Sequence, residues 1–210
     1  MKNSVIFDLD GTLWEVIDST YISANKIASK YNQDEITKEV ICSVFGLNKE
    51  DAAKKYFPKL TLDKSIPLMD EISKINIDYL TKNGGNLYPN LINILYELSK
   101  KYDLYIVSNT AEISYIEAFL ISSNTKSYFK DYIAASKLNI TKSEAIKKII
   151  KDNKINNSVY VGDTIIDYNS SLEASIPFIQ ARYGFGDNLK TDYYINNIDE
   201  LPSILCKIFV

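Results

Sequence analysis

The segment Val5-Ile6-Phe7-Asp8-Leu9-Asp10-Gly11-Thr12 decides the predicted fold, because it joins a short apolar strand to a polar turn. Similar apolar runs recur along the chain between helix-period segments, and they end at or near residues 107, 135, 161, 181 and 195. Strands that are apolar on both faces and alternate with helices are typical of a parallel sheet covered on both sides. The sequence therefore predicts an α/β fold with a doubly wound, mostly parallel, Rossmann-like sheet.

The connection from the first strand to the next is too long for a single crossover helix. Between Trp14 and about Gly85, apolar residues recur with helical period in four segments, around residues 21–31, 36–44, 52–57 and 66–80. A connection of this length is usually functional or has a structure of its own. The sequence therefore predicts a core domain of residues 1–14 and 86–210, with a small helical bundle inserted at residues 15–85.

The composition of the 210-residue chain narrows the possible functions. A net charge of -3 argues against a general nucleic-acid or membrane binder, because either class normally carries a basic patch. The chain has no histidine, which excludes Ser-His-Asp and Cys-His catalysis and histidine-ligated zinc. Cys42 and Cys206 fit no metal or redox spacing and are expected to be buried or half-buried. No apolar run reaches membrane-spanning length, so we expect a cytoplasmic protein, with a monomer as the default state.

Asp8 and Asp10 form the strongest candidate site. Side chains of a strand alternate with a period of two, so both carboxylates should project to one side while Leu9 faces the core. Two such carboxylates repel each other unless a cation lies beside them. Gly11 permits a sharp turn with a close backbone approach, which suits phosphate binding. The simpler alternative is an Asp-rich turn stabilised by local hydrogen bonds.

Two further polar elements follow a strand or begin a helix. Ser108 and Asn109 end the second strand, where they can bind a phosphate or simply cap the next helix. Lys142 lies at the start of a helix predicted at residues 141–152. A lysine there opposes the helix dipole, so a nearby anion explains it better than helix stability does, although a surface lysine is the alternative.

Asp163 follows the strand at residues 159–161, and Asp167 lies one helical turn later. Hard oxygen ligands in this arrangement suit Mg²⁺. Helix capping is an alternative for Asp163 and explains Asp167 less readily. Ligands of doubly wound sheets bind outside the carboxyl ends of the strands, where the strand order reverses. Adjacent central strands ending at Asp8 and Asp163 would bring these carboxylates together at that edge.

These motifs resemble those of the haloacid dehalogenase-like hydrolase superfamily, over essentially the whole chain. Asp8-Leu9-Asp10-Gly11-Thr12 matches the first motif of that family, Ser108-Asn109 the second, Lys142 the third, and Gly162-Asp163 with Asp167 the fourth. The helical insert resembles the family's cap of the phosphoglycolate-phosphatase type. The resemblance implies a Mg²⁺-dependent phosphatase that hydrolyses a small phosphorylated metabolite through an aspartyl-phosphate intermediate.

The resemblance also implies a role for each matched residue. Asp8 would be the nucleophile, and Asp10 would protonate the leaving alcohol and then activate water. Mg²⁺ would be held by Asp8, by the backbone carbonyl of Asp10, by Asp163 and, directly or through water, by Asp167. The expected phosphate-binding residues are Thr12, Ser108, Asn109 and Lys142.

Other activities remain as alternatives. True dehalogenases of the superfamily lack an aspartate at position 10, so the resemblance favours a phosphatase. A phosphomutase would use the same residues and return the phosphoryl group to a bound sugar. The non-enzymatic alternatives are a receiver domain, which is shorter and lacks a cap, and a phosphate-binding protein without catalysis. Specificity is expected to come from residues at the entrance, with Glu15 and residues 46–49, 110–112 and 182–186 as candidates.

Overall fold

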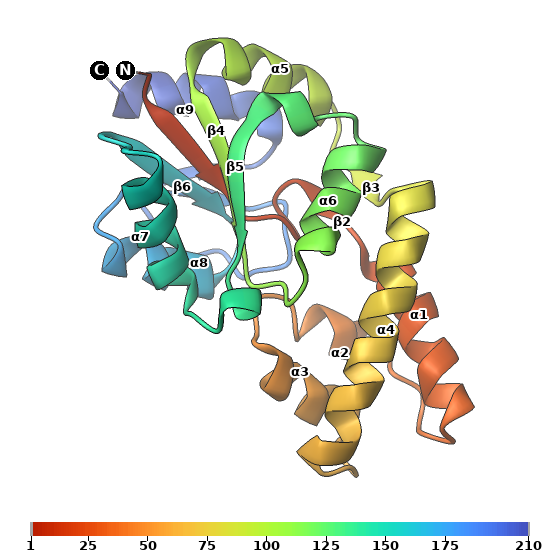
Figure 1. The fold of residues 1–210 in the computed structure, drawn as a ribbon. Helices are drawn as coiled ribbons and strands as arrows, with labels where there is room; N and C mark the ends of the chain where they lie inside the picture. The colour runs from red at the N-terminus through yellow and green to blue at the C-terminus, as the bar shows by residue number, and fades with distance from the viewer. Residues whose placement is uncertain (1, 210) are drawn as a thin grey trace.

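The computed structural model describes residues 2–209, which form a six-stranded sheet flanked by helices (Figure 1). All strands of this sheet are parallel, in the order β5-β4-β1-β6-β7-β8. Their bounds are β1 (Ser4–Phe7), β4 (Asp103–Ser108), β5 (Phe129–Ala134), β6 (Ser158–Gly162), β7 (Phe178–Ala181) and β8 (Tyr193–Ile195). The predicted doubly wound α/β fold is confirmed, and β1 and β6 are adjacent and central.

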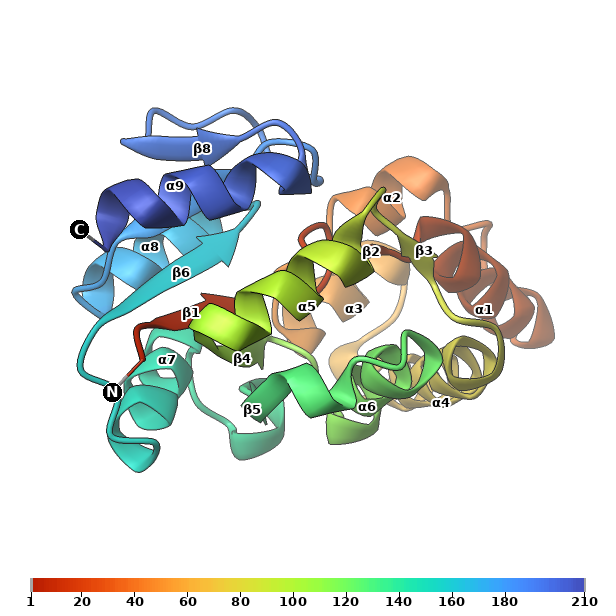
Figure 2. The same ribbon diagram turned by 90° about the horizontal axis from the view of Figure 1, so that it is seen from above.

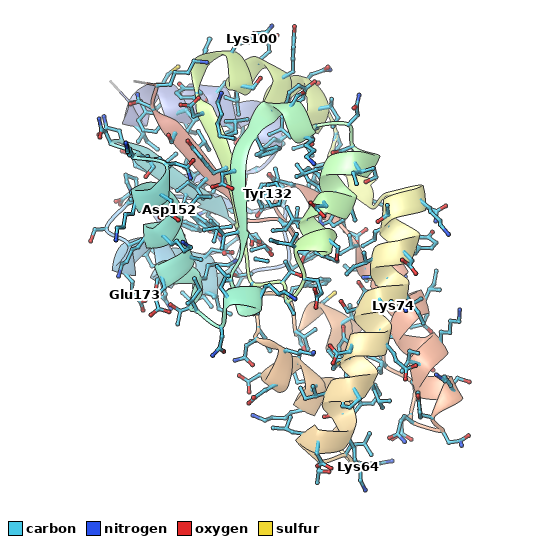
Figure 3. All side chains as sticks on the ribbon, viewed as in Figure 1. Lys64, Lys74, Lys100, Tyr132, Asp152 and Glu173 are labelled. Atoms are coloured by element: carbon cyan, nitrogen blue, oxygen red, sulfur yellow. The ribbon has the colours of Figure 1, made fainter. Side chains whose placement is uncertain are left out.

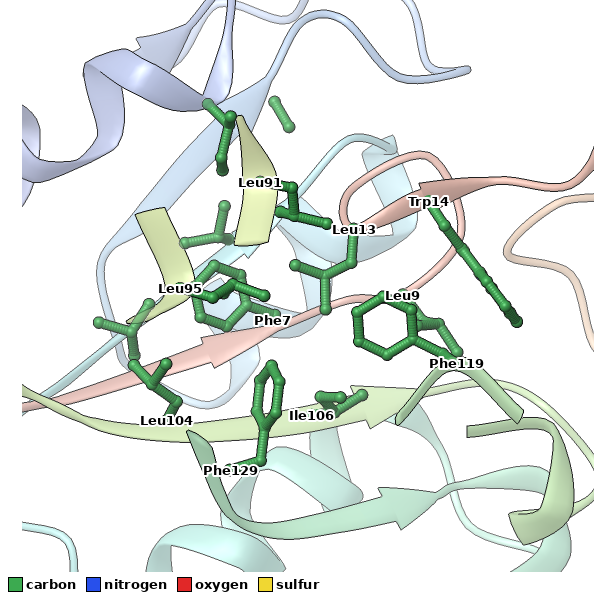
Figure 4. Packing of buried hydrophobic residues seen from close by; sticks show 14 of the residues in the cluster. Phe7, Leu9, Leu13, Trp14, Leu91, Leu95, Leu104, Ile106, Phe119 and Phe129 are labelled. Atoms are coloured by element: carbon green, nitrogen blue, oxygen red, sulfur yellow. The ribbon is translucent and has the colours of Figure 1, made fainter. Parts of the chain in front are cut away.

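Helices cover both faces of the sheet (Figures 1 and 2). One face packs against α5 (Leu91–Lys101), α6 (Ile113–Ser122) and α9 (Leu201–Ile208), and the other against α7 (Lys142–Asp152) and α8 (Ile165–Glu173). Short 3-10 turns lie at Lys126–Tyr128, Ser136–Leu138 and Ile198–Glu200. Val5 and Phe7 pack into the first core, which is the hydrophobic cluster on the face covered by α5, α6 and α9. Ile6 packs into the second core, on the face covered by α7 and α8, because successive side chains of a strand point to opposite faces. Figure 4 shows Phe7 in the first core, between Leu95 and Phe129.

Residues 15–85, which lie between β1 and α5 along the chain, form a helical unit with a hydrophobic cluster of its own. Its helices are α1 (Ile17–Lys30), α2 (Lys38–Cys42), α3 (Lys49–Tyr56) and α4 (Leu62–Asn83). Thr37 and Asn48 cap α2 and α3 by accepting hydrogen bonds from backbone N–H groups. The cluster consists of Ala24, Ile27, Ala28, Ile36, Ile41, Val44, Ala52, Tyr56, Phe57, Leu68 and Ile72. On the core side, α4 packs against α6 (Figure 1).

A small antiparallel ribbon connects this helical unit to the sheet. It pairs β2 (Trp14–Glu15) with β3 (Asn86–Leu87), the points at which the chain enters and leaves the unit. Glu15 accepts hydrogen bonds from the backbone N–H of Ile17 and, at 2.8 Å, from Asn86 Nδ2. The ribbon was not predicted, because strands of two residues are too short for a period to be visible.

Two expectations about isolated features can be checked here. Cys42 is partly buried, as expected, but Cys206 is exposed on α9, so the expectation for Cys206 is wrong. Charged side chains such as Lys100, Asp152 and Glu173 lie on the outer surface (Figure 3). Within residues 2–209, no helix combines the length and the apolar character needed to cross a bilayer.

Candidate active site

The carboxyl ends of three neighbouring strands bring the candidate residues together. Asp8 follows β1, Ser108 ends β4 and Asp163 follows β6, and all three side chains are buried. The backbone N–H of Asp8 donates to Val161 O at 2.8 Å, which extends the pairing of β1 with β6 by one residue. This is the edge at which doubly wound sheets bind ligands.

Lys142 contributes a buried cation to this edge. Thr141 caps α7 in a capping box with Glu144, and the helix start directs Lys142 inward. Lys142 Nζ donates to Asp8 Oδ1 at 2.7 Å and to Asp167 Oδ1 at 2.6 Å. Burial alone would lower the pKa of Lys142, but the charges of Asp167 and Asp8 outweigh it and raise that pKa well above its usual value. The ammonium group is therefore charged. The nearby anions that the sequence predicted for a lysine at a helix start are Asp8 and Asp167.

Negative charge exceeds positive charge in this cluster. Oxygen atoms of Asp8, Asp163 and Asp167 all lie within 4.8 Å of one another. When all three carboxyl groups are ionised, the single ammonium of Lys142 leaves an excess of two negative charges. Burial raises the pKa of Asp8 well above its usual value, with Lys142 opposing, and burial together with Asp167 raises the pKa of Asp163 to about 7. A divalent cation would compensate this excess of charge.

Asp163 and Asp167 differ in how much of each carboxylate remains available. Asp163 Oδ2 accepts from the backbone N–H of Phe185 at 2.7 Å, whereas Asp163 Oδ1 is buried and has no partner among residues 2–209. Both oxygens of Asp167 are engaged, Oδ1 with Lys142 and Oδ2 with the N–H and hydroxyl of Thr164. Asp163 therefore fits a direct ligand of a hard cation such as Mg²⁺, and Asp167 fits a residue that orients Lys142.

The structure corrects the sequence interpretation of capping at α8. Thr164, not Asp163, is the N-cap, and Asp167 completes a capping box with Thr164. Helix capping therefore accounts for Asp167 as well, whereas the sequence spacing indicated that it would not. Asp167 also packs closely against the backbone of Gly162, since a Cβ on Gly162 would come within 2.6 Å of Asp167 Cβ.

The side chain of Asp10 lies outside the carboxylate cluster. Asp10 Oδ1 accepts hydrogen bonds from Trp14 Nε1 at 2.7 Å and from the Tyr115 hydroxyl at 2.8 Å. Burial raises the pKa of Asp10 to about 6, and these two hydrogen bonds oppose the increase. Neither Trp14 nor Tyr115 was identified from the sequence as a site residue.

Two adjoining cavities lie between the helical unit and the sheet. The inner cavity, of about 170 Å³, is lined from the core by residues including Asp8, Asp10, Ser108, Tyr115 and Lys142, and from the helical unit by Phe45, Gly46, Ser73 and Asn76. The outer cavity, of about 630 Å³, shares Leu47, Ser73, Asn109 and Thr110 with the inner one. Of the predicted entrance residues, those lining a cavity are Gly46, Leu47, Lys49, Thr110, Ala111 and Glu112, whereas Glu15, Asn48 and residues 182–186 line neither.

Two of the expected phosphate-binding residues are placed differently from Ser108 and Lys142. The Thr12 hydroxyl is fully buried, has no partner within the described part of the chain and does not line the inner cavity. Asn109 lines the cavity, but its Nδ2 donates to Gly46 O at 2.8 Å and so joins the core to the helical unit. A second link lies nearby, where the rings of Phe45 and Phe185 stack with centroids 4.4 Å apart.

Comparison with known proteins supports the assignment of the fold and of the family. A family model described as haloacid dehalogenase-like hydrolase matches residues 5–181. A search of curated protein sequences found no match.

Several solved structures share the fold of the whole chain. A predicted phosphoglycolate phosphatase of Haemophilus somnus is 18% identical, with a TM-score of 0.86, over 97% of this chain and 98% of that chain. A predicted phosphatase of Clostridium acetobutylicum is 20% identical, with a TM-score of 0.81, over 99% of both chains. A haloacid dehalogenase-like family hydrolase of Streptococcus pneumoniae is 18% identical, with a TM-score of 0.85, over 97% of this chain and 98% of that chain. Together with the family match across most of its length, the motifs at the carboxyl edge show that this chain belongs to the haloacid dehalogenase-like hydrolase family.

Proposed function

We propose that this hydrolase is a phosphatase that cleaves a small phosphomonoester through an aspartyl-phosphate on Asp8. The observation that carries the proposal is the pairing of Asp8 with Lys142 beside a cavity that Asp10 also lines. A nucleophile, a buried cation and an acid–base group thus surround one space of about 170 Å³. Phosphoryl transfer requires this combination of positioning and electrostatic stabilisation.

The proposed reaction has two steps. First, an oxygen of Asp8 attacks phosphorus, the P–O ester bond breaks, and Asp10 gives a proton to the leaving oxygen. Then water attacks phosphorus, Asp10 takes a proton from that water, and the bond between phosphorus and Asp8 breaks. Ser108 and Lys142 would bind the phosphoryl oxygens, with Thr12 and Asn109 as outer members of the set. A pKa of about 6 at Asp10 suits a group that both donates and accepts a proton near neutral pH.

We propose Mg²⁺ as the cofactor. The residues fit it, because they supply hard carboxylate oxygens, an excess of negative charge and an unpartnered oxygen on Asp163. Asp8, Asp163 and the backbone carbonyl of Asp10 would hold the ion, with Asp167 acting through Lys142 or through water. The bound ion would supply positive charge to the phosphoryl oxygens.

The helical unit, residues 15–85, is proposed to act as a cap that selects the leaving group. The outer cavity falls within the usual volume of small-molecule sites, about 300–1,000 Å³, and its lining mixes apolar residues with charged ones such as Lys74, Asp78 and Glu112. A leaving group that reaches this cavity would be polar and larger than the two-carbon acid of phosphoglycolate. We further propose a cytoplasmic location, since both cysteines are free, as is typical of a reducing compartment, and a monomer as the default state.

Phosphate release from 4-nitrophenyl phosphate, with and without Mg²⁺, tests the proposal. Mg²⁺-dependent turnover should disappear in Asp8→Asn and fall by about 10²–10⁴-fold in Asp10→Asn, because hydrolysis of the aspartyl-phosphate then lacks its general base. Asp18→Asn, an exposed carboxylate on α1, is the matched control and should keep full activity. Full activity in Asp8→Asn would refute the mechanism. Isomerisation of a sugar phosphate without release of free phosphate would indicate a phosphomutase instead.

A further inference from the structure

The carboxylate of Asp10 receives two hydrogen bonds, and both fall on the same oxygen. Trp14 Nε1 donates to Oδ1 at 2.7 Å, and the Tyr115 hydroxyl donates to Oδ1 at 2.8 Å. No residue in the described range 2–209 donates a hydrogen bond to Oδ2 of Asp10. Since Asp10 lines the inner cavity, Oδ2 is the oxygen left for a bound ligand.

Packing fixes the positions of both donors. Trp14 is fully buried, and its ring meets Tyr115 edge-on, with centroids 5.4 Å apart and an interplanar angle of 70°. Phe119, one turn further along α6, meets the same indole at 5.4 Å and 76° (Figure 4). The backbone also holds Trp14, since its carbonyl accepts from the N–H of Gly11 at 2.9 Å. Neither donor can follow Asp10 if the carboxylate rotates, so the pair defines one orientation.

A buried indole N–H requires some acceptor, and this need alone could account for one hydrogen bond. It does not account for a second donor, from a helix 105 positions away, that binds the same oxygen of the same carboxylate. We infer that Trp14 and Tyr115 are positioning residues for the acid–base step and that they assign the transferred proton to Oδ2 of Asp10. This inference rests on the proposed phosphatase function.

The chemistry of this assignment balances in both half-reactions. As the ester bond breaks, the proton leaves Oδ2 for the departing oxygen, and Asp10 becomes an anion whose charge on Oδ1 meets two donors. When water attacks the aspartyl-phosphate, Oδ2 takes a proton from that water, and the bond between phosphorus and Asp8 breaks. Because a neutral carboxyl becomes an anion in the first step, the two hydrogen bonds strengthen as the proton leaves.

Tyr115→Phe tests the inference, because it removes one donor and keeps the ring. The substrates are phenyl phosphate, whose leaving phenolate depends on protonation, and 4-nitrophenyl phosphate, whose leaving group depends on it much less. For kcat/KM, we expect a loss of about tenfold with phenyl phosphate and of less than about threefold with 4-nitrophenyl phosphate, a fraction of the usual contribution of a general acid. Tyr132→Phe is the matched control (Tyr132 is labelled in Figure 3), since it removes a tyrosine hydroxyl that donates at 3.0 Å to Glu117, a residue of α6 like Tyr115.

The outcomes separate this inference from the function on which it rests. Equal losses of kcat/KM with the two substrates, or no loss with either, would overturn the role of Tyr115 even if Asp8→Asn is inactive. Trp14→Phe should change the ratio of the two kcat/KM values in the same direction, and this ratio is independent of the amount of folded protein. A wild-type protein that hydrolyses neither substrate would overturn the proposed function and the inference together.

Discussion

Replacing Lys142 with methionine should destabilise the protein more than any other single loss of a lysine charge. The lysine ammonium lies 2.7 Å from Asp8 and 2.6 Å from Asp167, and the three side chains are 2%, 8% and 0% exposed. Methionine has a similar length and no charge. The substitution therefore leaves two buried carboxylates without their cation, while Asp163 adds a third negative group nearby.

The expected size of the effect follows from this burial. Removal of one partner from a buried ion pair costs about 3–5 kcal/mol, because the remaining charge is desolvated and uncompensated. For a domain of about 150–250 residues, 1 kcal/mol shifts Tm by roughly 2–4 °C. Lys142→Met should therefore lower the Tm of the metal-free protein by about 6–20 °C at neutral pH. The loss should become smaller as the pH falls, because protonated carboxyl groups need no counter-charge.

Thermal unfolding followed by circular dichroism measures this effect. Lys148→Met is the control, because its ion pair with Asp152, at 2.7 Å on the same helix, is about half exposed and should contribute less than about 1 kcal/mol. Adding Asp167→Asn to Lys142→Met should recover part of the lost Tm, since it removes one of the unpaired charges. A decrease in Tm no greater than that of the control would refute the view that the lysine charge holds this cluster together.

Three further results are expected. Mg²⁺ should raise the Tm of the wild-type protein, because it binds the folded carboxylate cluster and not the unfolded chain, and Asp163→Asn should abolish most of this increase. The increase should be larger at pH 8 than at pH 6, because the pKa of Asp163 is raised to about 7 by burial and a bound proton competes with the cation; an equal increase at both values would contradict this. Phe45→Ala, which removes the ring stacked on Phe185, should raise KM by about twofold to tenfold with little change in kcat, from an aromatic pair of about 0.5–1.5 kcal/mol.

The fold was largely predictable because each of its main elements has a local signal. Val5-Ile6-Phe7 is apolar on both faces, and the structure places Ile6 in one core and its neighbours in the other. The elements that sequence analysis missed have no such signal. The β2–β3 ribbon is two residues long on each side, and its pairing joins positions about 70 residues apart. The exposure of Cys206 likewise depends on which face of α9 packs against the sheet, which residue type does not reveal.

The same distinction, between residues with a local sequence signal and residues without one, applies to the candidate site. Asp8, Ser108, Lys142 and Asp163 were found because they follow strands or begin a helix, and the parallel topology brings such positions together. The contacts that orient them come from residues whose type permits many roles. Tyr115 has the apolar character expected of a buried helix face, and only the folded chain shows its hydroxyl on Asp10. A buried Tyr or Trp usually needs a partner for its polar atom, so an aromatic residue that packs near a motif aspartate is the signal by which such orienting contacts can be sought.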